Sequence, residues 1–261
     1  MITAEKTQED KCALHGSDVV IRYDSVCKSF GEKVVLKDLD LDVHRGETLA
    51  IMGPSGIGKS VTLRHAVGLM QPDSGRVLVE GHDMATIAPE DLAELRRRMG
   101  YLFQDGALIN WLSVAENIAL PLRENTDLSE SEIRDRVEHK LGLVQMQGTG
   151  HLMPPELSGG MRKRVGLARA LVTEPEIVFF DEPNTGLDPE ISMSVNHLIR
   201  DLAERLQITS IVVTHLVSCI LVAADRVVLI DQGRVFDEGT PEEFIRSKNE
   251  RLKRFLAKPY D

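Results

Sequence analysis

A glycine-rich segment in the first third of the chain has the residue types and the spacing to hold a phosphate group. Its members are Gly53, Pro54, Ser55, Gly56, Ile57, Gly58, Lys59 and Ser60. The glycines allow the backbone to curl so that several N–H groups point at one anion. Lys59 can reach the β- and γ-phosphates, and the Ser60 hydroxyl can hold Mg²⁺. The segment predicts a site for a nucleoside triphosphate.

The residues on either side of this loop are typical of a strand and a helix. Residues 48–52, Thr-Leu-Ala-Ile-Met, form an apolar run, and a helix is expected from Lys59 towards Met70. The start of that helix adds unpaired N–H groups and the positive end of its dipole. A chance glycine turn before a helix is the alternative, but the complete Gly-x4-Gly-Lys-Ser pattern after a strand argues against it.

Two carboxylates close another apolar run. Asp181 and Glu182 follow the apolar residues 177–180 and precede Pro183. A buried strand would deliver both acids to the carboxyl edge of a sheet, beside the phosphate loop. We expect Asp181 to hold Mg²⁺ through water, and Glu182 to orient and polarise the water that attacks the γ-phosphate. An ordinary turn after a strand would look the same in isolation, so the phosphate loop decides between the two.

Small residues also precede a basic helix, residues 162–171. Ser158, Gly159 and Gly160 form a helix start suited to phosphate. A plain helix cap, with glycines for close packing, is an equal alternative. We interpret the basic side chains of the helix as a solvated face and not as a nucleic-acid site.

The remaining periodicity indicates the elements that must position these groups. Alternation of apolar and polar residues predicts half-buried antiparallel strands at 19–23 and 34–43. A strand at 76–80 and a charged helix at 89–99 follow. Between about 105 and 155, helical periodicity at 114–120 and 133–143 indicates a helical insertion. Thereafter continuous apolar strands alternate with a helix, which predicts a parallel sheet covered on both faces; these segments are 177–180, 190–206, 210–213 and 227–231.

Composition and charge bound the class of protein. The chain has 261 residues, of which 42% are hydrophobic, and a formal net charge of −10. The acidic balance argues against a surface built for a nucleic-acid backbone. Cys12, Cys27 and Cys219 fit no metal or disulfide spacing, so free thiols in a reducing cytosol are expected. Polar residues interrupt the longest apolar stretch, 208–224, so it is interpreted as a strand, a loop and a buried helix and not as a membrane span.

The order of these motifs resembles the nucleotide-binding subunit of an ABC transporter, over about residues 19–255. The resemblance implies an α/β fold, with a P-loop NTPase (RecA-like) parallel-sheet core, an antiparallel β subdomain and an inserted α-helical subdomain. The nucleotide-binding domain would span 17–246, with the helical subdomain at about 105–160. Residues 1–16 would be a flexible N-terminal tail, not a secretory signal, and 247–261 a C-terminal tail. Two copies would sandwich two ATP molecules, each site joining the phosphate loop of one copy to Ser158, Gly159 and Gly160 of the other.

The resemblance also assigns roles to single residues. Gln104 would be a ligand of Mg²⁺ that senses a membrane partner, and His215 the switch histidine that contacts the γ-phosphate. Asp188 would communicate across the dimer, although a helix cap is equally expected of it. Phe30 would stack on adenine, with a core phenylalanine as the alternative. The implied catalytic set is Glu182, His215 and Lys59, and the implied metal set is Ser60, Gln104 and Asp181. The implied nucleotide set is Phe30, Gly53, Pro54, Ser55, Gly56, Ile57, Gly58, Lys59, Ser60, Val61, Gln104, Ser158, Gly159, Gly160 and Asp188.

Two positions depart from the usual family pattern. Leu216 follows the histidine where many relatives have an acid, and Met161 follows Leu-Ser-Gly-Gly where most importers have glutamine. The segments around 103–108, 117–124 and 157–164 resemble one branch of the family, the ATPases of MCE-associated lipid transport systems (MlaF/Mkl-like). That resemblance implies a multi-span permease, an MCE-domain lipid-binding protein and a place on the cytoplasmic, inner face of the cell membrane.

Other functions fit part of this pattern. An importer ATPase for amino acids, metals or anions shares most of the motifs. A non-transport ABC ATPase is disfavoured, because only 97 positions separate Ser60 from Leu157, too few for a long coiled coil. Residues 105–122 are the expected contact surface for the membrane subunits. Within them, Trp111 is as compatible with core packing as with exposure.

Overall fold

A six-stranded sheet, in the order β10-β9-β3-β8-β7-β6, lies at the centre of the molecule. The computed structural model describes residues 18–54, 56–249, 252, 253 and 256. The parallel strands are β3 (Thr48–Met52), β6 (Met99–Leu102), β7 (Ile177–Asp181), β8 (Thr209–Val213) and β9 (Arg226–Asp231). At one edge β10 (Arg234–Gly239) pairs antiparallel with β9. This is the parallel sheet that the apolar runs predict.

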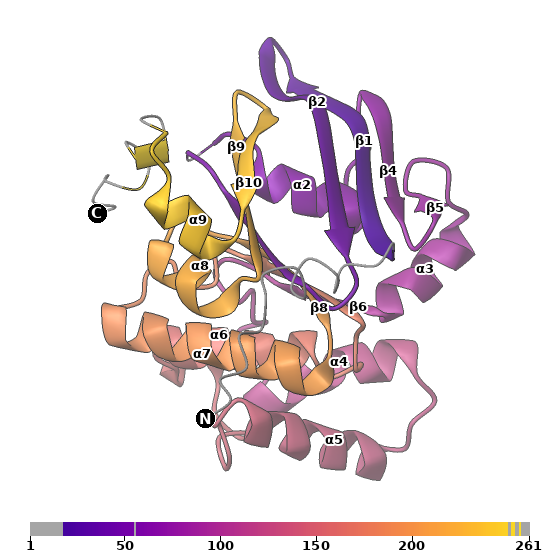
Figure 1. The fold of residues 1–261 in the computed structure, drawn as a ribbon. Helices are drawn as coiled ribbons and strands as arrows, with labels where there is room; N and C mark the ends of the chain where they lie inside the picture. The colour runs from indigo at the N-terminus through magenta and orange to yellow at the C-terminus, as the bar shows by residue number, and fades with distance from the viewer. Residues whose placement is uncertain (1–17, 55, 250–251, 254–255, 257–261) are drawn as a thin grey trace, which may run out of the picture.

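A second sheet is antiparallel throughout and lies in the order β2-β1-β4-β5. Its strands are β1 (Val19–Phe30), β2 (Lys33–His44), β4 (Ser74–Val79) and β5 (His82–Asp83). Figure 1 shows this sheet on one side of the molecule, with most helices on the other side of the central sheet. The helices are α2 (Lys59–Ala66), α3 (Pro89–Arg97), α4 (Val114–Asn125), α5 (Glu130–Leu143), α6 (Gly159–Ala170), α7 (Pro189–Leu206), α8 (Val217–Ala223) and α9 (Pro241–Arg246), with a 3₁₀ turn at Pro154–Glu156.

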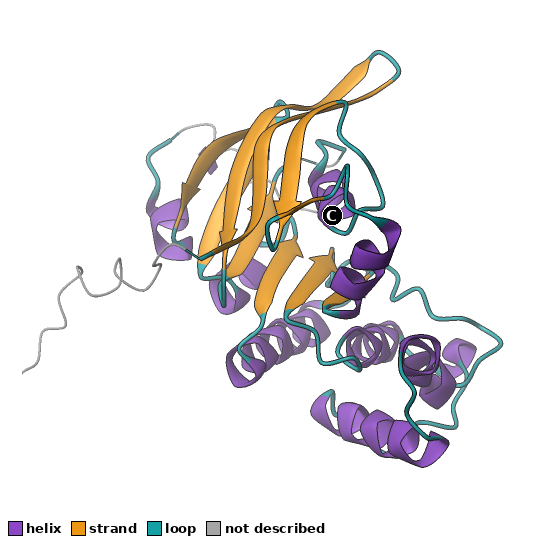
Figure 2. Ribbon diagram, turned by 90° about the vertical axis from the view of Figure 1, so that its right-hand side faces the viewer, coloured by secondary structure: helices purple, strands orange, loops and turns teal. Residues whose placement is uncertain are grey.

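The central sheet is covered on both faces because successive side chains of its strands point to opposite sides. Phe179 packs into a core with α2 and the antiparallel sheet, where Leu63 and Leu39 are fully buried. Phe180, the next residue, packs into a second core with α4 to α8. Figure 2 shows the helices of this second core grouped on the lower side of the strands. The α/β fold class expected from the motifs is confirmed.

Several element boundaries differ from those expected. The helix after the phosphate loop ends at Ala66, short of Met70, because Gly68 adopts a left-handed conformation (φ 69°) that terminates it. The helix expected at 89–99 ends at Arg97, and Met99 begins β6. Helix α4 continues through Pro121 to Asn125, whose side chain donates a hydrogen bond to the Pro121 carbonyl oxygen. Strand β10 was not predicted.

The chain ends bear on the remaining expectations. The expected N-terminal tail, residues 1–16, lies outside the described residues, as does most of the expected C-terminal tail. Of the latter, Leu252 is fully buried in a cluster with Ile220 and Phe244. The proposed domain boundaries stay predictions. Within the described part of the chain, no helix combines the length and the apolar character that crossing a bilayer requires.

Gly100 allows α6 to approach β6 closely, and a methyl group there is expected to destabilise the fold. A Cβ at Gly100 would lie 2.3 Å from the Ala170 carbonyl oxygen and 3.2 Å from the Pro175 ring. Because the first of these neighbours is backbone, Gly100→Ala should lower the free energy of unfolding by about 1–3 kcal/mol. Urea denaturation measures the change.

Gly142→Ala is the matched control. Gly142 lies in α5, and a Cβ there would meet only the Gln147 amide nitrogen at 3.8 Å, an ordinary contact. Because alanine favours a helix over glycine, this variant should be neutral or more stable by up to about 1 kcal/mol. Equal stability of Gly100→Ala and wild type would contradict the packing argument.

Candidate functional site

The glycine-rich loop joins the end of β3 to the start of α2. Gly58, the residue before α2, has a φ of 112°, and a Cβ there would lie 2.6 Å from a methyl of Val35. Gly53 has a φ of 155°, and its Cβ would lie 2.5 Å from the Ile230 carbonyl oxygen. Both positions therefore require glycine, for conformation and for space. Ser55 lies outside the described residues, so its predicted role stays a prediction.

Lys59 folds back over this loop. Its ammonium donates hydrogen bonds to the carbonyl oxygens of Gly53, at 2.9 Å, and Pro54, at 3.3 Å. It also lies 3.6 Å from Glu182 Oε1. Burial lowers the pKa of Lys59, although the charges of Glu182 and Asp181 partly oppose this. A buried ammonium beside converging backbone is suited to bind an anion.

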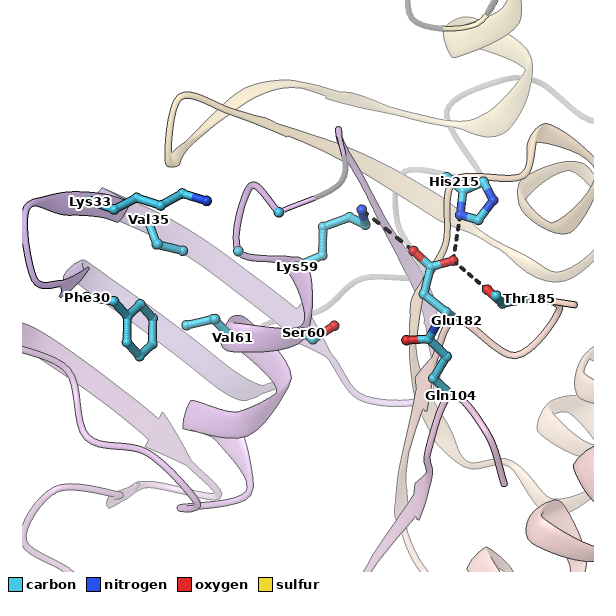
Figure 3. A pocket seen from close by; sticks show the side chains of 12 residues that line it. Phe30, Lys33, Val35, Lys59, Ser60, Val61, Gln104, Glu182, Thr185 and His215 are labelled. Atoms are coloured by element: carbon cyan, nitrogen blue, oxygen red, sulfur yellow. Dashed lines mark hydrogen bonds and ion pairs between the residues drawn. The ribbon is translucent and has the colours of Figure 1, made fainter. Parts of the chain in front are cut away.

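Glu182 is held by three side chains at the end of β7. His215 Nδ1 lies 2.6 Å from Glu182 Oε2, and the Thr185 hydroxyl donates to the same oxygen at 3.2 Å. Figure 3 shows the Glu182 carboxylate between Lys59 and His215. Burial raises the pKa of Glu182, but the hydrogen bond and charge of His215, with Lys59 and Thr185, outweigh it and hold that pKa below its usual value. The carboxylate is thus kept ionised and oriented.

Asp181, one residue earlier, accepts two hydrogen bonds. The Ser60 hydroxyl donates to Asp181 Oδ1 at 2.7 Å, and the Tyr101 hydroxyl donates to Asp181 Oδ2 at 3.1 Å. A hydroxyl, a carboxylate and the nearby Gln104 amide are hard oxygen donors of the kind that Mg²⁺ takes. Among the described residues, no group of three or more histidine, cysteine, aspartate or glutamate side chains could hold a metal by itself. These donors fit a magnesium ion that shares its ligands with phosphate and water.

The loop and Glu182 open onto one cavity of about 610 Å³. Figure 3 shows Phe30, Lys33, Val35 and Val61 at one end and Gln104, Glu182, Thr185 and His215 at the other, with Lys59 and Ser60 between them. The volume is in the range of small-molecule sites. Phe30 is 48% exposed, so the core alternative for this residue is wrong. An exposed ring at one end and a buried ammonium in the middle of the cavity fit a ligand with an aromatic part and an anionic part.

Other predicted residues do not line this cavity. Ser158 is the exposed cap of α6, where its hydroxyl accepts a hydrogen bond from the Met161 N–H at 3.2 Å. Asp188 caps α7 by accepting from the N–H groups of Glu190 and Ile191. Both residues therefore cap a helix, as one interpretation of each predicted. Ser158, Gly159, Gly160, Asp181, Asp188, Gly53, Pro54 and Ile57 are not among the residues that line the cavity.

One interpretation of the basic helix is wrong for Lys163. Its ammonium is buried and donates to the carbonyl oxygens of Gln104 and, at 3.3 Å, Glu182. It therefore does not belong to a solvated face. The sequence of a basic helix does not show which side chain points inward. That depends on where the loops carrying the Gln104 and Glu182 carbonyl oxygens lie.

Sequence reasoning missed four residues of the site. Lys33 and Val35 line the cavity from β2, close to Phe30 in the hairpin. Thr185 contacts Glu182, and Tyr101 contacts Asp181. A signal existed for Tyr101, since it lies three positions before Gln104 on a strand that ends at the same sheet edge. Its partner, however, could be found only from the pairing of β6 with β7.

The chain is similar in sequence and in fold to known proteins. The family model described as ABC transporter matches residues 36–185. The chain is 45% identical, over 227 residues, to the intermembrane phospholipid transport system ATP-binding protein MlaF of Haemophilus influenzae, covering 87% of this chain and 86% of that protein. It is 40% identical, over 238 residues, to the probable ribonucleotide transport ATP-binding protein mkl of Mycobacterium leprae, covering 91% and 69%. Its fold is similar to the dimeric post-hydrolysis state of the ATP-binding cassette MJ0796 bound to ADP and Pi, with a TM-score of 0.77 and 31% identity over 85% of this chain and 98% of that one.

Proposed function

Since the chain belongs to the ABC transporter family, we propose that it is the ATPase subunit of a complex that moves phospholipids or other lipids between membranes. Membership makes the chain an ATP-binding, ATP-hydrolysing transport subunit. The observation that carries the catalytic proposal is the Glu182 carboxylate, held between Lys59 and His215 in the cavity beside the phosphate loop. The lipid substrate is supported by the similarity to MlaF.

Each side chain in the cavity has a task that its position fits. The Phe30 ring stacks on adenine, with Val61 nearby, and Lys59 binds the β- and γ-phosphates together with the loop N–H groups. Ser60, Gln104 and Asp181 would hold Mg²⁺, which when bound neutralises charge on the phosphates. Glu182 orients a water molecule towards the γ-phosphate and accepts its proton, while His215 fixes the carboxylate and contacts the same phosphate.

The cavity of one copy is half of a site in this proposal. Ser158 is exposed at the start of α6, and Gly159 follows it in the first turn, where N–H groups have no carbonyl partner within the helix. These groups would bind the γ-phosphate held by a second copy. The similarity to the MJ0796 cassette, which is dimeric and bound to ADP and Pi, supports this arrangement. Gly160 is needed for packing in any case, since a Cβ there would lie 2.6 Å from an Ile191 methyl.

The surface at 105–122 is proposed to contact the permease. Trp111 is 81% exposed, so the core alternative for it is wrong, and Phe103 is 41% exposed. Phe103 lines a groove of about 400 Å³, together with Ile109, Leu120 and Pro121 among other residues. Exposed aromatic side chains and a groove lined by both apolar and basic residues are typical of a protein contact. The ATPase would thus bind the membrane complex, with its MCE-domain protein, on the cytoplasmic face of the membrane.

The test is purification of the tagged chain from detergent-solubilised membranes of its own organism. A multi-span permease, an MCE-domain protein and bound phospholipid should copurify with it. Recovery of a periplasmic solute-binding protein and no lipid would contradict the lipid proposal and favour import of a different solute; the name of mkl, which refers to ribonucleotide transport, gives that alternative its support. Trp111→Ala should reduce recovery of the permease, whereas Leu206→Ala, at a residue 40% exposed at the end of α7, should not.

A further inference from the structure

Both carboxylate oxygens of Asp181 accept a hydrogen bond, one from a residue of the phosphate loop and one from a residue outside it. Ser60 donates to Oδ1 from the phosphate loop itself. Tyr101 donates to Oδ2 from β6, a strand that contributes nothing else to the hydrogen bonds of this carboxylate among the described residues. Asp181 is only 6% exposed, so its orientation is set by these contacts and not by water.

The sheet geometry explains how Tyr101 reaches this oxygen. Tyr101 pairs with Phe179 in the parallel register of β6 and β7. Asp181 lies two residues beyond Phe179, on the same face of β7, about 6.6 Å further along the strand. A tyrosine side chain that leans along the strand spans that length and brings its hydroxyl to the carboxylate.

The ring of Tyr101 is held on two sides. Its centroid lies 4.4 Å from that of Phe103 and 6.1 Å from that of Phe179, to which it is stacked. A ring fixed between two others has little freedom to move its hydroxyl. The packing therefore holds Tyr101 in the one rotamer whose hydroxyl contacts Asp181.

We propose that Tyr101 is a positioning residue for the magnesium site: it fixes the second oxygen of Asp181 so that the carboxylate faces the metal shell as soon as ATP binds. Without the hydroxyl, the carboxylate could pivot about its bond to Ser60. A metal held mainly through ordered waters depends strongly on such orientation. The inference rests on the proposed role of Asp181 in binding Mg²⁺.

The experiment compares nucleotide binding with and without Mg²⁺ in the purified full chain. Binding of trinitrophenyl-ATP is titrated by fluorescence, once in Mg²⁺ and once in EDTA. Tyr101→Phe keeps the ring but loses a hydrogen bond to a charged group, so affinity in Mg²⁺ should fall by about tenfold. Affinity in EDTA should be within about twofold of wild type, since no phosphate-loop contact changes.

Two further variants separate positioning from packing. Phe103→Leu leaves the hydroxyl but removes one of the two rings that restrain it, so affinity in Mg²⁺ should fall by less than in Tyr101→Phe, with affinity in EDTA unchanged. In an Asp181→Asn background, adding Tyr101→Phe should have no further effect on binding in Mg²⁺, because Tyr101 acts through that carboxylate. Thermal unfolding monitored by circular dichroism confirms that each variant is folded.

The outcomes distinguish the two levels of the proposal. If wild-type affinity is the same in Mg²⁺ and EDTA, the magnesium site is wrong, and the role of Tyr101 with it. If wild type depends on Mg²⁺ and Tyr101→Phe matches it, only the role of Tyr101 is overturned. An equal loss in Mg²⁺ and in EDTA would show that the hydroxyl supports the fold in general, and would also overturn it.

Discussion

Glu182→Gln should lower kcat for ATP hydrolysis by about 10²–10⁴-fold, the usual contribution of a positioned general base. Glutamine has the shape of glutamate but cannot accept a proton from the attacking water. It can still contact His215 and Thr185, which in wild type lie 2.6 Å and 3.2 Å from Oε2. Binding of ATP should therefore change little, and closed dimers should accumulate because hydrolysis no longer reopens them.

Steady-state phosphate release and nucleotide titration measure the two effects separately. Glu190→Gln, at an exposed residue of the first turn of α7, is the matched control and should hydrolyse ATP at the wild-type rate. Size-exclusion chromatography with ATP should show a dimer for Glu182→Gln and not for the control. Unchanged turnover of Glu182→Gln would remove Glu182 from the role of general base.

Lys59→Ala should weaken binding of ATP-Mg²⁺ by about 10- to 100-fold, as expected for loss of a charge-assisted contact. The side chain of Lys59 is only 6% exposed, so water screens its charge poorly. The variant also loses the bonds to the Gly53 and Pro54 carbonyls that shape the loop. Hydrolysis at saturating ATP should fall as well, because the same ammonium is proposed to neutralise the γ-phosphate.

Lys33→Ala provides the comparison for this prediction. Lys33 lines the same cavity from β2, and its ammonium lies near Gly56 of the phosphate loop, but its side chain is exposed to solvent. Its removal should weaken the binding of ATP-Mg²⁺ by less than about threefold, in the range of solvent-exposed charge contacts. Isothermal titration calorimetry gives both affinities. Wild-type affinity in Lys59→Ala, or an equal loss in Lys33→Ala, would contradict the phosphate-loop assignment.

The residues that the sequence could predict are those defined by strand ends. Lys59, Glu182 and His215 each follow a buried apolar strand, and parallel strands bring their carboxyl ends to one edge, so their proximity follows from the pattern alone. The fold class was predictable for the same reason. The boundaries of α2 and α4 were not, because Gly68 ends one helix by its backbone conformation and Pro121 does not end the other.

Contacts between side chains of different elements were beyond sequence reasoning. Whether Tyr101 meets Asp181 depends on the register of β6 against β7, which no local pattern fixes. Whether the Lys163 side chain points inward depends on how close α6 lies to the loops that carry Gln104 and Glu182. The exposure of Phe30 and Trp111 likewise follows from how the hairpin and the helical segment lie on the core. The roles of Ser158 and Gly159 involve a second copy and stay predictions.

Lys163 joins α6, the helix that Ser158 caps, to two loops of the candidate site. Lys163 lies five residues after Ser158, and its ammonium donates hydrogen bonds to the loops that bear Gln104 and Glu182. Five residues of helix measure about 7.5 Å, shorter than the width of the helix itself, so this segment cannot bend appreciably. In a dimer, any shift of those loops on ATP hydrolysis would therefore move Ser158 by a similar amount in the opposite site. The helix would act as a short, stiff lever through which each site senses the state of the other.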